Sequence, residues 1–478
     1  MTQPLWTVSD MASAMRAARR DTLPQTITGL SIDSRTINPG EAYFAIKGDV
    51  HDGHDFVAAA LKAGAALAVV SEARRGDFAP DAPLLIVPDV LAALYALAAA
   101  ARARLQAKVV AVTGSAGKTS TKEMLRHVLS TQGATHASVA SFNNHWGVPL
   151  SLARCPADAA FAVFEIGMNH AGEIEPLVKL VRPHVAIVTT VEPVHLEFFG
   201  SLEAIADAKA EIFTGLEPGG VAILNRDNSQ FTRLKKQAKE AGVSRIVSFG
   251  EARSAEARLL DAALHPAGSA LHARILDHDV TYKLGMPGHH MALNSLAALS
   301  VASLFGADLA LAALSLSQLS PGAGRGARQV LRTGNGEATL IDESYNANPA
   351  SMAAALDVLG KAEIGAHGRR IAVLGDMLEL GETGPELHRA LVKAVLRNEV
   401  DKVFCCGPLM RRLWEALPSG RRGGYADDSA ALVPQVVAAI RDDDAIMVKG
   451  SLGSRMKTIV NALERSFPVQ SARDDATV

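Results

Sequence analysis

Cysteine, aromatic side chains and an excess of either charge are all scarce in this sequence. The 478 residues include three cysteines and only 5% aromatic residues. Cys155, Cys405 and Cys406 provide neither a disulfide framework nor a CxxC metal motif, so we expect a reducing, cytoplasmic environment. Lysines and arginines number 48 against 50 acidic residues, a net charge of −2. This balance argues against nucleic-acid binding, which needs an excess of basic groups.

Long hydrophobic runs are also missing. The longest Ala/Leu-rich run, residues 90–101, lies between Asp89 and Arg102 and is shorter than the roughly 20 residues that span a bilayer. Residues 1–20 contain no continuous apolar segment, which argues against a secretory signal. We therefore expect no membrane insertion.

The length and the apolar content predict a folded protein of several domains. At about 150 residues per domain, the chain has room for roughly three, and 48% of its residues are hydrophobic. Apolar strands without polar alternation, separated by helices, predict an α/β fold with parallel sheets covered on both faces. A Gly/Pro-rich stretch at residues 320–326 marks a boundary. We predict a small α/β domain over residues 1–87, a central parallel-sheet domain over 88–325 and a Rossmann-like domain over 326–478.

The elements expected in these domains follow from the apolar runs. In the first domain we expect strands near residues 42–46, 68–70 and 84–87. A helix over 90–105 precedes central strands at 108–113, 160–166, 184–191 and 220–225. In the last domain we expect strands at 338–342, 370–375, 400–406 and 445–448.

A strand, a glycine-containing loop and a helix start meet at residues 109–120, in the order that phosphate binding requires. Glycines allow backbone N–H groups to surround phosphate oxygens, Lys118 can reach the β and γ phosphates, and the Thr119 hydroxyl can ligate Mg²⁺. The first glycine comes at Gly114, closer to Gly117 than the strict GxxxxGK[ST] spacing. We predict that the loop binds nucleotide through Gly114, Ser115, Ala116, Gly117, Lys118, Thr119 and Ser120. An ordinary glycine-rich turn is the alternative.

Polar residues that follow the next strands suggest a metal site. Glu165 ends one apolar strand, His195 follows another, and Lys209 lies on a helix shortly after. Each has a simple structural reading, as a strand-end carboxylate, a loop histidine and a solvated lysine. Together with Thr119 they could hold Mg²⁺ near a γ-phosphate.

In these and further segments the chain resembles the Mur ligase family, the ATP-dependent amide-bond-forming enzymes of peptidoglycan precursor synthesis. Within that family it is most similar to the members that add D-alanyl-D-alanine. The Asp-Asn-Pro-Arg string expected of the diaminopimelate-adding members is absent. The segments that carry the resemblance are residues 31–35, 39–48, 52–56, 143–150, 165–170, 195–197, 344–349, 374–381 and 449–451.

The resemblance implies a role for each matching residue. Lys118, a carbamylated Lys209, His195 and Arg325 would be catalytic. Thr119, Glu165, His195 and Lys209 would bind the metal. Asn143, His290, Asn294, Arg325 and Asp342 would contact ATP. Ser31, Asp33, Ser34, Arg35, Lys47, Gly48 and His54 would contact the uridine nucleotide. Tyr345, Asn346, Asn348 and Lys449 would contact the dipeptide.

The implied activity is a ligase reaction that joins UDP-N-acetylmuramoyl-tripeptide to D-alanyl-D-alanine while ATP is cleaved to ADP and phosphate. The cofactors would be ATP and Mg²⁺, the first domain would bind the UDP substrate, the central domain ATP and the third the dipeptide. We expect a monomer that closes about residues 322–326 during catalysis.

Several alternatives remain open at this stage. A folylpolyglutamate-synthase-like or another Mur-type ligase would share the phosphate loop, but more than 100 residues precede Gly114, whereas the former begin close to the loop. A nucleotide-dependent switch would not need the second set of metal ligands. A dehydrogenase would need a Gly-x-x-Gly turn, which is missing after Gly375.

Some single residues also have simpler structural interpretations. Asn143 and Asn144 could simply form a turn. Asp33 and Arg35 could be only a surface ion pair. Asn348 and Pro349 could cap a helix, a role compatible with binding.

Overall fold

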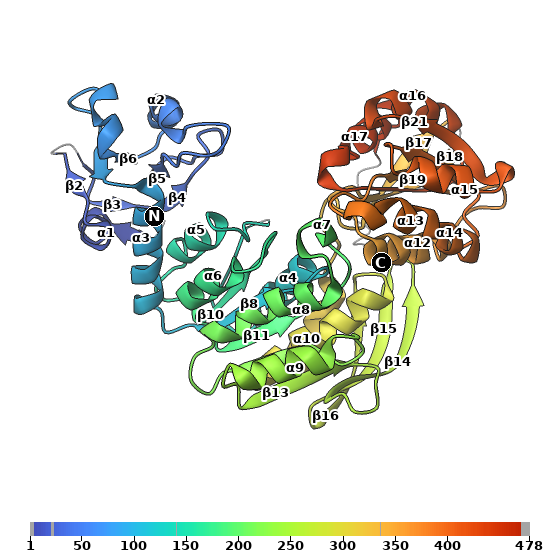
Figure 1. Cartoon of the computed structure of the whole chain (residues 1–478), viewed down its shortest axis with the longest axis horizontal. Coiled ribbons are helices and arrows are strands. Elements are labelled where there is room, and N and C mark those ends of the chain that lie inside the picture. Colours follow the sequence, from blue (N-terminus) through green and yellow to red (C-terminus); the bar gives the residue numbers. More distant parts are fainter. Residues whose placement is uncertain (1–3, 21–22, 140, 335, 470–478) are drawn as a thin grey trace, which may run out of the picture.

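Three lobes follow one another along the chain, and the central lobe contacts both others (Figure 1). The structure, a computed structural model, describes residues 4–20, 23–139, 141–334 and 336–469. The outer limits predicted for the first and third domains, residues 1 and 478, lie outside this range. None of the helices in the described ranges is long and apolar enough to cross a membrane.

The N-terminal lobe contains a five-stranded sheet and a separate two-stranded ribbon. The sheet has the order β2-β7-β6-β5-β4, in which only the β2–β7 pair is antiparallel, and β1 pairs with β3. The strands are β1 (Trp6–Thr7), β2 (Ala18–Arg19), β3 (Thr26–Ile27), β4 (Gly29–Ser31), β5 (Glu41–Phe44), β6 (Leu67–Ser71) and β7 (Leu84–Val87). The helices are α1 (Val8–Met15), α2 (Val57–Lys62) and the long α3 (Val90–Arg104), which leads into the central lobe.

The central lobe is built on a nine-stranded sheet with the order β16-β15-β14-β13-β12-β11-β8-β10-β9. Its strands are β8 (Lys108–Thr113), β9 (Thr135–Ala137), β10 (Phe161–Glu165), β11 (Val185–Val188), β12 (Val221–Asn225), β13 (Arg245–Gly250), β14 (Ala257–His265), β15 (Gly268–Ile275) and β16 (His278–Leu284). Its helices are α4 (Lys118–Ser130), α5 (Gly147–Ala153), α6 (Ile174–Val181), α7 (Leu196–Phe199), α8 (Leu202–Ala210), α9 (Phe231–Glu240), α10 (His289–Leu304) and α11 (Leu309–Ser315).

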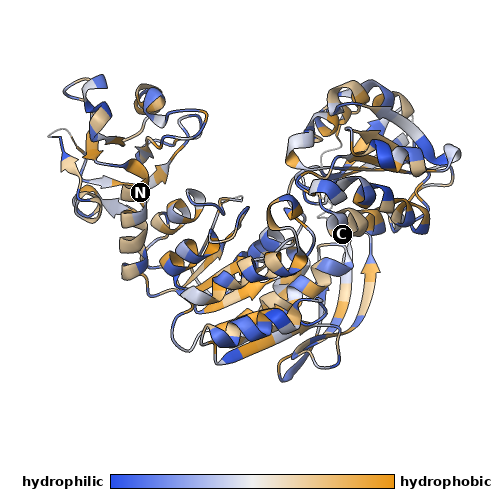
Figure 2. Cartoon of the chain, viewed as in Figure 1, coloured by the Kyte–Doolittle hydropathy of each residue, from blue (hydrophilic) through white to orange (hydrophobic). Residues whose placement is uncertain are grey.

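This central sheet is parallel only from β9 to β14, which departs from the parallel sheet predicted. Strands β14, β15 and β16 form an antiparallel meander. Along β15, buried and exposed residues alternate, as expected of a strand with one face open to water. By contrast, β8, β10 and β11 are buried along nearly their whole length and appear hydrophobic in Figure 2.

The C-terminal lobe has a six-stranded sheet with the order β17-β18-β22-β19-β20-β21, parallel except for the β17–β18 hairpin. Its strands are β17 (Ala327–Thr333), β18 (Gly336–Glu343), β19 (Arg370–Gly375), β20 (Lys402–Cys406), β21 (Arg422–Ala426) and β22 (Ala445–Lys449). Its helices are α12 (Pro349–Gly360), α13 (Gly384–Ala390), α14 (Val392–Arg397), α15 (Arg411–Ala416), α16 (Ser429–Ala439) and α17 (Lys457–Ser466). Among the described residues, strands and helices alternate as the predicted fold class requires.

The hydrophobic clusters join two of the lobes and leave the third separate. One cluster runs from Trp6 in the N-terminal lobe through Leu94 of α3 to Phe164 in the central sheet. The two clusters of the C-terminal lobe include no described residue from either other lobe. The N-terminal lobe is therefore joined to the central lobe by shared apolar packing, whereas the C-terminal lobe is not.

Candidate active site

The loop between β8 and α4 is shaped by two glycines with positive φ. Gly114 has φ 148°, and a Cβ there would lie 1.9 Å from Thr189 Oγ1. Gly117 has φ 82°, caps α4 without a side chain, and a Cβ there would lie 2.7 Å from Asn294 Nδ2. The first N–H groups of a helix have no intrahelical partner, so this glycine-capped N-terminus is suited to bind phosphate oxygens.

Lys118 lies over this loop. Its ammonium donates to the carbonyl oxygen of Gly114 at 2.8 Å. Burial lowers the pKa of Lys118, the carboxylate of Glu165 opposes that shift, and Arg325 adds to it. Two cations and one carboxylate are thus close enough to influence one another at the carboxyl ends of β8 and β10.

Glu165 is almost completely buried, with 1% of its surface exposed. Its carboxylate accepts from the Thr119 hydroxyl at 2.8 Å and from Asn143 Nδ2 at 2.7 Å, both neutral donors. In the described part of the chain no lysine or arginine forms a salt bridge with it. A buried carboxylate with neutral partners and an adjacent hydroxyl suits Mg²⁺, which binds few protein oxygens and keeps several waters.

The other two predicted metal ligands, His195 and Lys209, lie near Lys118. His195 precedes α7 with φ 54°, and its Nδ1 pairs with Glu379 Oε2 of the C-terminal lobe. No group of three or more His, Cys, Asp or Glu side chains that could hold a metal occurs in the described ranges. The Glu165 carboxylate and the Thr119 hydroxyl therefore form a corner of two oxygens.

Lys209 lies on α8 and is only 2% exposed. Burial, with a contribution from the charge of Lys118, lowers the pKa of Lys209 well below its usual range. The charge of Lys209 in turn affects His195, where burial lowers the imidazole pKa, Glu379 opposes the shift, and Lys209 and Lys118 add to it. The structure thus brings Lys118, His195 and Lys209 together, as expected of one site.

The residues predicted to flank the adenine lie on α10. Asn294 is buried against Gly117 of the phosphate loop. His290 lines a pocket of about 250 Å³ between the β14–β15 turn, the start of α10 and helix α12 of the C-terminal lobe. Apolar side chains including Leu264, Pro287 and Val358 form much of its wall, as expected of a site for a flat base.

Arg325 lies in the segment between the central and C-terminal lobes and contacts the neighbourhood of the phosphate loop. Its guanidinium donates to Ser141 Oγ at 2.9 Å and lies 4.0 Å above the Tyr345 ring. Ser141 Oγ is in turn 3.5 Å from Thr119 Oγ1. Arg325 therefore faces the same corner as Glu165 and Thr119.

Asp342, predicted to contact the ribose, is engaged within its own lobe. Its carboxylate accepts from the Gly324 N–H at 3.1 Å, from Ser344 Oγ at 2.6 Å and from Lys457 at 3.0 Å. These bonds fix the segment that carries Arg325. A ribose contact would have to share or replace one of them.

The residues predicted to bind the dipeptide divide into two groups. Tyr345 lies under Arg325, at the interface. Lys449 is buried and donates to Glu343 Oε2 at 3.2 Å and to the Asn346 carbonyl at 2.9 Å. Asn348 caps α12 in a capping box with Ser351, which confirms the predicted cap. The side chains of Lys449 and Asn348 thus already make hydrogen bonds within the C-terminal lobe.

The residues predicted to bind the uridine nucleotide lie in the N-terminal lobe. Ser31 and Asp33 bond through one hydroxyl, which donates to the Asp33 carbonyl at 3.1 Å and accepts from its N–H at 3.2 Å. Asp33 pairs at 2.7 Å with Arg35, which is exposed, so the surface ion pair considered above is present. Ser34 is half-buried. The backbones of Lys47 and Asp52 form an isolated antiparallel β-bridge.

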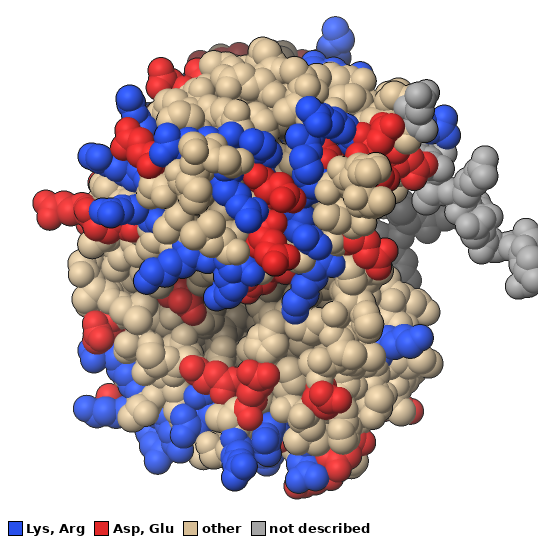
Figure 3. Space-filling view, turned by 90° about the vertical axis from the view of Figure 1, so that its right-hand side faces the viewer, with Lys and Arg blue, Asp and Glu red and all other residues tan. Residues whose placement is uncertain are grey.

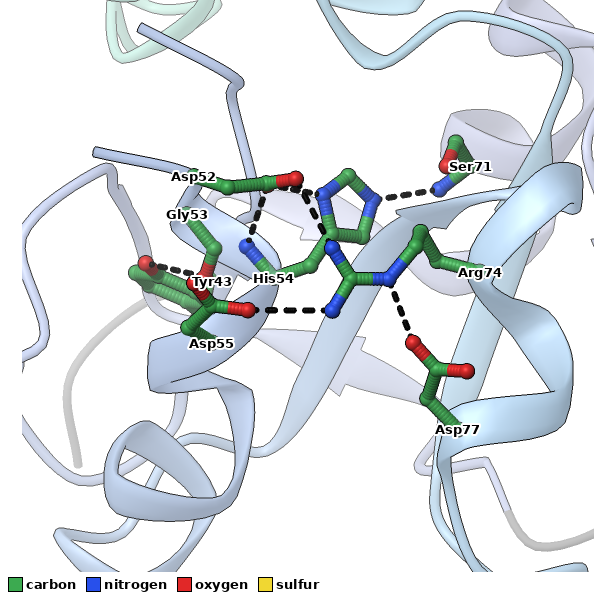
Figure 4. Close-up of polar contacts among 8 residues, drawn as sticks. All are labelled: Tyr43, Asp52, Gly53, His54, Asp55, Ser71, Arg74 and Asp77. Atoms are coloured by element: carbon green, nitrogen blue, oxygen red, sulfur yellow. Dashed lines mark hydrogen bonds and ion pairs between the residues drawn. The ribbon is translucent and has the colours of Figure 1, made fainter. Parts of the chain in front are cut away.

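His54 is buried and fully hydrogen-bonded (Figure 4). It is 5% exposed; its Nδ1 pairs with Asp52 at 2.6 Å, and its Nε2 accepts from the Ser71 N–H at 2.9 Å. Asp52 also accepts from Arg74 at 2.8 Å. Both ring nitrogens are occupied, so His54 holds the loop that carries Lys47 and Gly48 rather than offering a free nitrogen to a ligand.

Several residues that shape this site have no role predicted from the sequence. Glu379 lies in the segment 374–381, which carries part of the family resemblance, but no function was predicted for it. Ser141 and Arg74 lie outside all the segments that carry the resemblance. Thr189, whose hydroxyl donates to the Ala116 carbonyl at 2.5 Å, packs against Gly114. Only the hydrogen bonds to residues distant in sequence show what these four do.

Comparisons with known proteins show the family to which this fold belongs. Residues 26–104, 112–302 and 328–452 match family models described as the Mur ligase family catalytic domain, the Mur ligase middle domain and the Mur ligase glutamate ligase domain. The chain is 35% identical to the UDP-N-acetylmuramoyl-tripeptide--D-alanyl-D-alanine ligase of Escherichia coli, over 92% of this chain and 94% of that protein. It is 31% identical to the protein of that name from Rickettsia prowazekii, over 90% and 94%.

Solved structures give the same result. A crystal structure of MurF from Acinetobacter baumannii superposes with a TM-score of 0.83 at 30% identity and covers 97% of this chain and 99% of that one. The ADP complex of MurF from Thermotoga maritima gives 0.75 at 25% identity, over 92% and 97%. On matches that extend through all three lobes, the chain belongs to the Mur ligase family.

Proposed function

We propose that the protein is an ATP-dependent ligase that joins D-alanyl-D-alanine to UDP-N-acetylmuramoyl-tripeptide in peptidoglycan precursor synthesis. The carrying observation is the chain-long similarity to proteins of that name, including all three lobes. The site supports the same conclusion, because Lys118 and Arg325 face one corner where a transferring phosphoryl group would meet the carboxylate it activates.

The reaction needs an activated carboxylate, because oxide is a poor leaving group. An oxygen of the tripeptide carboxylate attacks the γ-phosphorus of ATP, the bond from phosphorus to the bridging oxygen breaks, and ADP leaves. The amine of D-alanyl-D-alanine then attacks the acyl carbon of the acyl phosphate. The carbon–oxygen bond breaks, phosphate leaves, and the amine loses a proton.

The chain's own groups stabilise negative charge in both steps. Lys118 and Arg325 offset the charge of the phosphoryl oxygens, and the glycine-capped N-terminus of α4 orients N–H donors toward them. Thr119 and Glu165 would hold Mg²⁺, which supplies further charge neutralisation when bound. His195 borders the same corner.

Lys209 is suited to carbamylation. A neutral amine is needed to attack CO₂, and burial together with Lys118 lowers the pKa of Lys209 in that direction. In the reaction the Nζ–carbon bond forms, one proton leaves the nitrogen, and a carbamate anion results. That anion would add an oxygen ligand to the corner formed by Thr119 and Glu165.

Carbamylation can be measured directly. Protein equilibrated with ¹³C-bicarbonate should show a carbamate resonance that is absent in Lys209→Ala. The exposed Lys239 of α9 offers a control, because Lys239→Ala should keep the signal. An unchanged spectrum in Lys209→Ala would exclude this modification.

Each lobe would serve one substrate. Residues 1–87 would bind the uridine nucleotide, residues 88–325 ATP, and residues 326–478 the dipeptide through Tyr345 and its neighbours. The pocket at His290 between the central and C-terminal lobes would take the adenine. Because one chain supplies the residues of all three sites, we propose a monomer.

A cytoplasmic location is part of the same proposal. Cys155, Cys405 and Cys406 are buried free thiols, as expected in a reducing compartment. On the face shown in Figure 3, basic and acidic side chains are interspersed, which gives no support to nucleic-acid binding there.

The proposal is tested by phosphate release from MgATP with each acceptor omitted in turn. Release that requires both UDP-N-acetylmuramoyl-tripeptide and D-alanyl-D-alanine supports the function. Release with another amino acid in place of the dipeptide would indicate a different Mur-type ligase. Release only with a folate and glutamate would indicate the folylpolyglutamate-synthase-like reaction.

A further inference from the structure

The only side-chain hydrogen bond that His195 makes within the described residues is to another lobe. Its Nδ1 pairs with Oε2 of Glu379, which lies in the loop that follows β19. A carboxylate only accepts, so the proton lies on Nδ1 and the ring is held with Nε2 turned away from Glu379. The orientation of a central-lobe residue therefore depends on the C-terminal lobe.

The backbone at this contact is unusual on both sides. His195 has φ 54° and Glu379 has φ 63°, and neither is glycine. Left-handed backbone at non-glycine residues costs free energy and persists where the surroundings impose it, often at functional sites. Because both residues adopt this costly conformation and are bonded to one another, we infer that the surrounding fold imposes the contact.

The Glu379 loop is anchored in its own lobe. Met377 N–H donates to His388 Nε2 at 2.9 Å, and Leu378 N–H donates to Ser451 Oγ at 3.0 Å. Leu380, the next residue after Glu379, is buried. These contacts fix the loop, and therefore the position from which the Glu379 side chain reaches His195.

The same loop approaches α7 through its backbone. Glu197 N–H donates to the Glu379 carbonyl at 3.4 Å. A Cβ at Gly381, where φ is 58°, would lie 3.2 Å from Glu197 Cα. The loop fits against α7 because Gly381 has no side chain, and this fit sets the position of Glu379 relative to His195.

Stability does not account for the pair. The Glu379 side chain is 46% exposed and that of His195 is 25% exposed, and ion pairs at such positions contribute little to folding. The two lobes share no apolar cluster within the described chain. The contact orients a side chain rather than holding two lobes together.

We propose that Glu379 is a positioning residue for His195, supplied by the C-terminal lobe, so that the central site is completed only when the two lobes are docked. This inference rests on the proposed function. A carboxylate that orients a functional histidine typically affects activity by about 10-fold to 100-fold.

Kinetics of Glu379→Ala and Glu379→Gln test the proposal against Glu382→Ala, an exposed glutamate in the same loop. We expect Glu379→Ala to lower kcat by about 10-fold to 100-fold, with KM for UDP-N-acetylmuramoyl-tripeptide unchanged. Glu379→Gln keeps an acceptor oxygen and should lose less, and Glu382→Ala should match the unmodified protein. An unchanged kcat in Glu379→Ala, a loss confined to KM for D-alanyl-D-alanine, or an equal loss in Glu382→Ala would overturn the proposal.

A second measurement is independent of activity. Two-bond ¹⁵N–¹H spectra of histidine rings, with His195 identified by its disappearance in His195→Gln, report which ring nitrogen carries the proton. We expect an Nδ1–H ring that changes in Glu379→Ala and not in Glu382→Ala. An identical His195 pattern in Glu379→Ala would refute the contact. A protein without ligase activity that still shows this change would contradict the proposed function and leave the contact standing.

Discussion

Two carboxylate–histidine pairs in this molecule use the same chemistry in opposite ways. Asp52 and His54 lie in one lobe, and the ring uses both nitrogens on neighbours in that lobe. Glu379 and His195 lie in different lobes, and the ring uses one nitrogen. The first pair is complete whenever its lobe is folded. The second is complete only in one arrangement of two lobes.

The packing beneath each pair explains the difference. The N-terminal lobe shares a hydrophobic cluster with the central lobe, so its geometry is set by folding. The C-terminal lobe has its own clusters and meets the central lobe through polar contacts such as Glu379–His195. Polar interfaces of this kind permit relative domain motion. A site that spans such an interface can be switched by closure, whereas a site within one core cannot.

The largest effect is expected at the site shared by both lobes. Lys118→Ala should lower ATP-dependent turnover by at least about 1000-fold, because a preorganised cation at the phosphoryl group is removed. Phosphate release measures it, and circular dichroism checks the fold. Arg126→Ala, on the same helix and 50% exposed, should remain active. Full activity in a folded Lys118→Ala protein would refute the phosphate-loop assignment.

His54→Ala should have a different effect from Glu379→Ala, which distinguishes the Asp52–His54 pair from the Glu379–His195 pair. Removing the ring leaves the Ser71 N–H without its partner, which costs about 1–3 kcal/mol of unfolding free energy. We expect a lower Tm and a higher KM for the UDP substrate with kcat unchanged, the reverse of the split expected for Glu379→Ala. A lower kcat at unchanged Tm would mean that His54 acts in the chemistry and that the distinction between the pairs is wrong.

Acid should weaken the first pair. Burial raises the pKa of Asp52, but hydrogen bonds and charges from His54 and Arg74 outweigh it, so the net pKa is lowered. A carboxylate whose pKa is lower in the folded state stabilises the fold above about pH 4 and loses that contribution as the pH falls through its folded value. Urea unfolding from pH 6 to pH 3 should therefore show a smaller stability loss in Asp52→Asn than in the unmodified protein. Asp49→Asn, at an exposed site on the same loop, should keep the full loss, and equal slopes in all three would exclude this role.

The smallest effect is a change of shape. Closure about the segment 322–326 should lower the radius of gyration when an ATP analogue and both substrates are bound. Small-angle scattering measures this change, and the protein with the UDP substrate alone is the control. An unchanged radius with all ligands bound would show that the lobes do not close.

Much of the fold could be predicted from local patterns. The strand at residues 370–375 follows from its apolar run, and the helix start predicted after the glycine-containing loop is the beginning of α4. The meander β14–β16 was missed because alternating strands bury only half their residues and give a weak apolar signal. The fold class and the family are confirmed.

The sequence by itself determined the chemistry available at the site: a phosphate loop at Lys118, a carboxylate at the end of a strand and a family resemblance extending through three lobes. The individual roles of the predicted site residues stay predictions. Only the tertiary structure showed that the His54 ring is paired within its own lobe, whereas the His195 ring is paired with another lobe. The reason is physical: a side chain's role depends on the atoms around it. Those atoms come from Ser71 and Arg74 in one case and from Glu379, 184 residues away, in the other.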